Sequence, residues 1–102
     1  MKLIKHIIEQ MEEELEGAEE YIECAMKHKL DYPNIASMYY EMSLTEITHF
    51  EKLHSAAVTL INEAKARGEE PTVEMKAIYD YEHEKAMEEA TRIRVMQEMY
   101  KR

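Results

Sequence analysis

The chain has 102 residues, a formal net charge of −9, one cysteine, two glycines and two prolines. An acidic surface repels phosphate backbones, which argues against nucleic-acid binding, and a lone cysteine excludes an intrachain disulfide framework and a CxxC metal site. No stretch of about 18 residues is apolar enough to span a membrane, so we expect a cytoplasmic protein without a membrane partner. The length predicts one domain, residues 1–102, and the scarcity of glycine and proline favours helices.

The first predicted helix spans residues 2–29. Most of its glutamates neighbour one another at helical spacing, which predicts a solvated face made of Glu9, Glu12, Glu13, Glu16, Glu19, Glu20 and Glu23. Glu14 differs, because it interrupts an apolar stripe formed by Leu3, Ile7, Met11, Ala18, Tyr21 and Ala25. A lone buried carboxylate is costly unless it is paired or binds a metal.

The second and third predicted helices span residues 34–67 and 72–100. Pro33 breaks the chain before the second helix, with Asp31 and Asn34 as turn or cap residues; Gly68 and Pro71 separate the second from the third. The short first turn predicts an antiparallel hairpin, and the third helix should fold back on the second or reach a partner chain.

Glu46 and His49 lie three residues apart on the second helix and share one face with apolar side chains. Counted from the turn at Tyr32, Glu14, Glu46 and His49 lie roughly 27, 21 and 25 Å along the hairpin at about 1.5 Å per residue. The hairpin therefore predicts that these three ionisable side chains meet at one level.

Two carboxylates and an imidazole suit Fe(II) and Mn(II) and would accept Zn(II). In di-iron carboxylate bundles, two helices each give a Glu and two others each give Glu-x-x-His. One chain supplies half of this set through Glu14, Glu46 and His49. A homodimer would supply six ligands, close a four-helix bundle and bury the apolar seam that one hairpin leaves exposed, and a higher homo-oligomer remains open.

The segments ELEGAEEY (residues 14–21) and EITH (residues 46–49) resemble the ferritin-like superfamily of di-iron carboxylate proteins. In rubrerythrins and bacterioferritins, the first Glu ligand is followed seven residues later by a Tyr near the metals, as Glu14 is by Tyr21 here. The half-size members, the encapsulated ferritins, dimerise to build one ferroxidase centre between chains. The similarity covers about the first 67 residues of the chain.

The resemblance implies an all-α fold in which a long antiparallel hairpin and a third helix dimerise into a ferritin-like four-helix bundle. It implies two iron ions per dimer, with manganese or zinc as alternatives, bound by Glu14, Glu46 and His49. It also implies ferroxidase or another oxidoreductase activity toward O2 or peroxide, with no catalytic residue beyond the metal ligands. Tyr21 is expected to hydrogen-bond a ligand carboxylate, and Tyr39 to face the same site.

Two other interpretations remain open at this point. The chain can be a non-catalytic structural or interaction module whose buried Glu/His cluster is only a hydrogen-bonded core network. On the third helix, Asp80 and His83 are spaced like ligands of an accessory cation, and Glu82 or Glu89 could complete a site within one chain. The third helix is otherwise expected to present a solvated or interface face, and His54 is expected to contact it.

Overall fold

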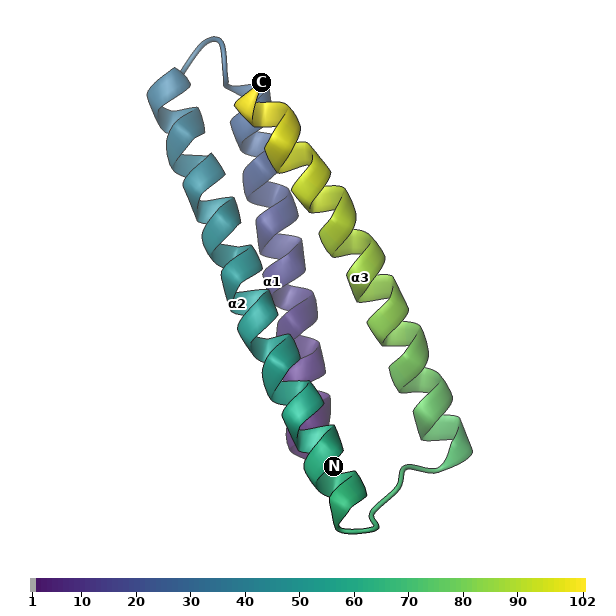
Figure 1. Ribbon diagram of the computed structural model, residues 1–102. Helices are drawn as coiled ribbons and strands as arrows, with labels where there is room; N and C mark the ends of the chain where they lie inside the picture. Colours follow the sequence, from purple (N-terminus) through teal and green to yellow (C-terminus); the bar gives the residue numbers. More distant parts are fainter. Residues whose placement is uncertain (1) are drawn as a thin grey trace.

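The computed structural model describes residues 2–102, and its regular elements are all helices, which confirms the predicted all-α class for this part of the chain. Helix α1 comprises Lys2–Lys27, α2 comprises Pro33–Ala66 and α3 comprises Val73–Lys101. The three helices run side by side in a rod of 56 × 19 × 18 Å (Figure 1). None of these helices combines the length and hydropathy needed to cross a membrane.

The ends of the helices follow from a few local signals. Pro33 occupies the first turn of α2, where its missing N–H costs no helical hydrogen bond, and Tyr32 rather than the expected Asp31 or Asn34 is the N-cap. Gly68 follows α2 with φ at 77°, a left-handed conformation that suits glycine at a helix end. Thr72 caps α3 by accepting a hydrogen bond from the backbone N–H of Met75 at 3.2 Å.

The hydrophobic core lies where α1 meets both other helices. Its buried α1 residues are Ile4, Ile7, Met11, Leu15, Ala18, Ile22 and Ala25. The stripe is therefore rotated relative to the prediction, and Leu3 is 54% exposed. The rotation has a physical reason. We had expected α3 to fold back on α2, but it packs mainly against α1, so α1 buries a second face.

A buried polar chain joins all three helices toward the end of the rod that carries the α1–α2 turn. The Ser43 hydroxyl donates to the Ala18 carbonyl at 2.7 Å and accepts from the Gln97 amide at 2.9 Å. Ser43 and Gln97 are both buried, so these bonds fix the position of α3 against the hairpin.

Toward its C-terminus, α3 lies close to the α1–α2 turn, and toward its N-terminus it diverges from the hairpin (Figure 1). At the close end, the rings of Tyr40 and Tyr100 stack with centroids 4.7 Å apart, and Lys29 donates a hydrogen bond to the Tyr100 carbonyl. At the divergent end, Val73 and Ile78 are 86% and 58% exposed. α3 therefore packs tightly against the hairpin near its C-terminus and loosely near its N-terminus.

Candidate metal centre

Glu14 on α1 and Glu46 and His49 on α2 come together in the hairpin. One ligand atom from each residue lies within 4.8 Å of the other two. His49 Nδ1 is 3.4 Å from Glu14 Oε2 and 3.8 Å from Glu46 Oε1. The three side chains predicted to share one level of the hairpin do so, and among the described residues no other Asp, Glu, His or Cys forms such a group.

The cluster lies at the surface of the α1–α2 groove rather than in the closed core. The side chains of Glu14 and Glu46 are each 25% exposed, and that of His49 is 46% exposed. On α1, Glu12 contacts α3, and Glu14 follows two residues later, which is a rotation of about 200° around the helix. The three ligands therefore face away from α3 and remain open to solvent or to another chain.

The Glu14 carboxyl perturbs the carboxyl of Glu46. Hydrogen bonding with the Glu14 carboxyl, followed by burial and by the negative charge of Glu14, raises the pKa of Glu46 to about 7, and the charge of His49 opposes this rise. Glu14 Oε2 is shielded from solvent and accepts no hydrogen bond from the described residues. The pair thus has an unsatisfied oxygen and favours a shared proton or a cation between its members.

Gly17 provides the space that the Glu46 carboxylate occupies. A Cβ added at Gly17 would lie 3.0 Å from Glu46 Oε2, closer than nearly all Cβ contacts in proteins. Glycine costs a helix interior stability, so its place inside α1 needs a reason, and the close approach of Glu46 supplies one. The sequence carried a signal for this, since Gly17 is the only glycine within a helix and lies one turn after Glu14.

Tyr21 and Tyr39 lie together on the same groove. Their rings stack with centroids 6.1 Å apart and planes 28° from parallel. Tyr21 is seven residues beyond Glu14 and Tyr39 seven before Glu46, so the stack lies roughly 10 Å along the helices from the ligands. Within the described part of the chain, neither hydroxyl donates a hydrogen bond to the three ligands.

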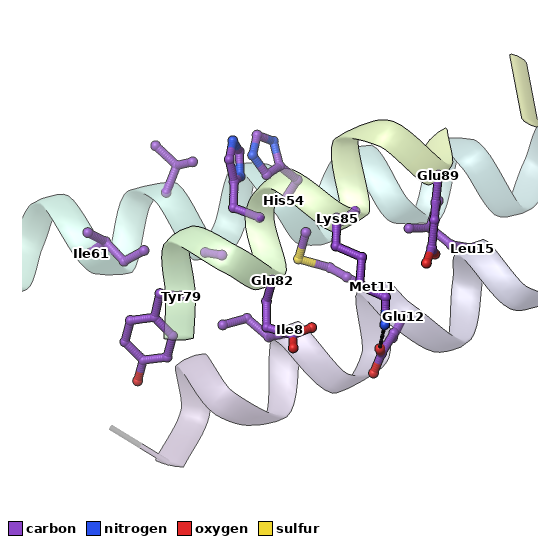
Figure 2. Close-up of a pocket in the computed structure, with 14 residues that line it drawn as sticks. Ile8, Met11, Glu12, Leu15, His54, Ile61, Tyr79, Glu82, Lys85 and Glu89 are labelled. Atoms are coloured by element: carbon purple, nitrogen blue, oxygen red, sulfur yellow. Dashed lines mark ion pairs between the residues drawn. The ribbon is translucent and has the colours of Figure 1, made fainter. Parts of the chain in front are cut away.

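The ionisable residues of α3 that were candidate ligands do not join the Glu14 cluster. Asp80 accepts a hydrogen bond from Lys76 at 3.2 Å, and His83 stacks on His54 of α2 with ring centroids 5.2 Å apart. The predicted contact of His54 with the third helix is thereby confirmed. Glu82 and Glu89 line a separate cavity between the helices (Figure 2), so neither completes the Glu14 cluster within one chain.

Part of the acidic face of α1 is used for packing. Arg92 on α3 makes a two-pronged ion pair with Glu19 at 2.7 and 2.9 Å, and Lys85 lies 3.6 Å from Glu12. The prediction of a wholly solvated face was therefore wrong for Glu19, which is half-buried, because α3 brings basic side chains to it.

Comparison with protein families, with curated proteins and with solved structures finds no match for this chain. Functional inference accordingly rests on the chemistry of the groove.

Proposed function

We propose that this protein binds a divalent transition-metal ion through Glu14, Glu46 and His49. The observation that carries the proposal is the convergence of two carboxylates and one imidazole, from two helices, within 4.8 Å. Mixed oxygen and nitrogen ligands of this kind suit Fe(II) and Mn(II). Two further observations support metal binding: the shielded Oε2 of Glu14 accepts no hydrogen bond, and Gly17 leaves space for the Glu46 carboxylate.

We further propose that two copies of the chain face each other across this groove and form one dinuclear centre. Each copy would contribute one Glu from α1 and the Glu-x-x-His pair from α2, which is half of the six-ligand set of a carboxylate-bridged bundle. Leu3 and Met42 lie on the same side as the ligands and are 54% and 36% exposed. A second hairpin seated there would bury this apolar surface as well as the open side of the site.

A dinuclear iron centre of this type supports oxidation of Fe(II). Two Fe(II) ions would each give one electron to O2, which takes up two protons and leaves as hydrogen peroxide, with two Fe(III) ions formed. The carboxylates of Glu14 and Glu46 favour the higher charge of Fe(III), and His49 supplies the nitrogen ligand. Ferroxidase activity is therefore the reaction that we propose for the centre.

Metal content and mass together test the proposal. Protein purified from cells grown with iron and manganese should contain about two metal ions per two chains, and light scattering should give the mass of a dimer. The double variant Glu14→Ala/His49→Ala should lose the metal, whereas the control Glu13→Ala/His28→Ala should keep it, because Glu13 lies on the exposed face and His28 pairs with Asp31 at the turn.

The possible results separate the parts of the proposal. Absence of stoichiometric metal from the wild-type protein, with the double variant as stable as wild type, would refute metal binding and favour the structural module. Stoichiometric metal in a monomer would refute the dimer. Fe(II) oxidation no faster than in buffer would remove ferroxidase activity and leave metal binding in place.

A further inference from the structure

A second pair of potential ligands lies between α2 and α3, on a different face of α2 from the first cluster. His49 contacts α1 through Glu14, whereas His54, five residues later, contacts α3 through His83. The His54 and His83 rings lie 5.2 Å apart between centroids with planes 26° from parallel. Two imidazoles from two helices thus meet where neither carboxylate of the first cluster takes part.

The spacing of the two rings matches that of imidazoles bound to one metal ion. With metal–nitrogen bonds of about 2.0–2.1 Å and a tetrahedral angle, the centroids of two coordinated imidazoles lie roughly 5 Å apart. The observed separation of 5.2 Å allows a common ion, and because the rings are stacked with planes 26° from parallel, both side chains must rotate to point a nitrogen at it.

One ring nitrogen of this pair lacks a partner. His54 Nε2 is shielded from solvent and makes no hydrogen bond with the described residues. A neutral imidazole nitrogen with a free lone pair is the group that a metal ion binds. A buried nitrogen without a hydrogen bond is costly, and a metal ion would satisfy it.

The pair also borders a cavity that can hold the remaining ligands of an ion. This cavity has a volume of about 80 Å³ and is lined by residues of all three helices, with Lys85 of α3 reaching Glu12 of α1 along its wall (Figure 2). One water molecule needs about 10–15 Å³ of such space, so the cavity has room for water ligands beside the imidazoles.

We infer that His54 and His83 form a second metal site, which takes a divalent ion with a preference for imidazole, Zn(II) or Cu(II), and clips α3 to α2. The other polar and aromatic contacts between these helices, made by Arg94, Gln97 and Tyr100, all lie in the C-terminal half of α3. His83 is the contact nearest to the divergent end, so an ion there would hold the part of α3 that is otherwise least attached (Figure 1). The site does not depend on the proposed function of the Glu14 cluster.

Zinc titration in a background without the first cluster tests this inference. The variant Glu14→Gln/Glu46→Gln/His49→Ala should still bind about one Zn(II) per chain in calorimetry with zinc chloride. Adding His83→Ala should lower the affinity at least tenfold, whereas adding His28→Ala should leave it unchanged, since His28 lies at the other end of the rod. His83 is exposed, so its replacement should not unfold the chain, and circular dichroism without metal checks this.

Histidine-ring NMR shows which atoms bind. Saturating Zn(II) should shift the ring nitrogen signals of His54 and His83 and leave those of His28 in place, and Zn(II) should raise the melting temperature of the background variant but not of its His83→Ala or His83→Gln derivative. Unmoved signals from His54 and His83, or equal zinc affinity with and without His83, would overturn the inference.

Discussion

Replacing Gly17 with alanine should raise the stability of the protein and weaken the metal binding that we propose for Glu14, Glu46 and His49. An alanine inside a helix is more stable than a glycine by about 0.5–1 kcal/mol. The new Cβ would lie 3.0 Å from Glu46 Oε2, which is the end of a flexible side chain and can rotate away without straining the backbone. The free energy of unfolding of the metal-free protein should therefore increase.

The metal affinity of the proposed site should fall, whereas the stability of the fold should rise. The Glu46 carboxylate must move by a few tenths of an ångström, and metal–ligand distances tolerate only about 0.2 Å of change. Disturbing a group that positions a ligand typically costs 10- to 100-fold in metal affinity, and we expect a loss on the order of tenfold here. Gly17→Ala should thus separate folding stability from metal binding.

Chemical denaturation of the metal-free protein and Mn(II) titration of the folded protein measure the two effects. Ser55→Ala is the control, because Ser55 is exposed on α2 and lies outside the cluster, so it should leave manganese affinity unchanged. If Gly17→Ala binds manganese as tightly as wild type, Gly17 does not make room for a metal ligand. If Gly17→Ala destabilises the metal-free protein, the Glu46 side chain does not rotate away from the new Cβ as we expect.

Three further predictions concern the groups that hold the helices together. Ser43→Ala should lower the free energy of unfolding by about 1–3 kcal/mol, because the buried Gln97 amide loses its acceptor, and Ser43→Ala/Gln97→Leu should recover part of this loss in urea denaturation. Because the pKa of Glu46 is raised to about 7, the native metal-free protein holds a proton that the unfolded chain releases above its ordinary value of 4.5. Its free energy of unfolding should therefore fall as the pH rises from about 5 to about 8, and a Glu46→Gln variant with the same slope would refute this. Arg92→Ala should change the free energy of unfolding only slightly, because the Arg92 side chain is 52% exposed, and a strong coupling to Glu19 in a double-mutant cycle would contradict this.

The sequence was sufficient for features that depend on one helix or on one short turn. The positions of Pro33, Gly68 and Thr72 place the helix ends to within two residues, because caps and breakers act locally. The meeting of Glu14 with His49 follows from the constant rise of the helix once the turn is located.

The contacts of α3 with the other helices could not be predicted from helical periodicity and local turn signals. The packing of α3 against α1 brings together residues far apart in the sequence, such as Arg92 and Glu19, which are 73 positions apart. A glutamate with acidic neighbours looks solvated until its partner is known. The stacking of His54 on His83 likewise needs the register of α3 against the hairpin, which a 3.6-residue period does not fix.

The position of α3 decides whether a second chain has access to the cluster. α3 covers the side of α1 that carries Glu12 and Glu19, and the groove with Glu14 and Gly17 lies on the other side. Had α3 packed over that groove, a partner hairpin would first have to displace it. As α3 lies, two hairpins can approach with both copies of α3 on the outside, so α3 does not obstruct the proposed dimer. Through Gln97, which donates to the Ser43 hydroxyl that itself donates to the Ala18 carbonyl, α3 is instead linked to both helices of the hairpin.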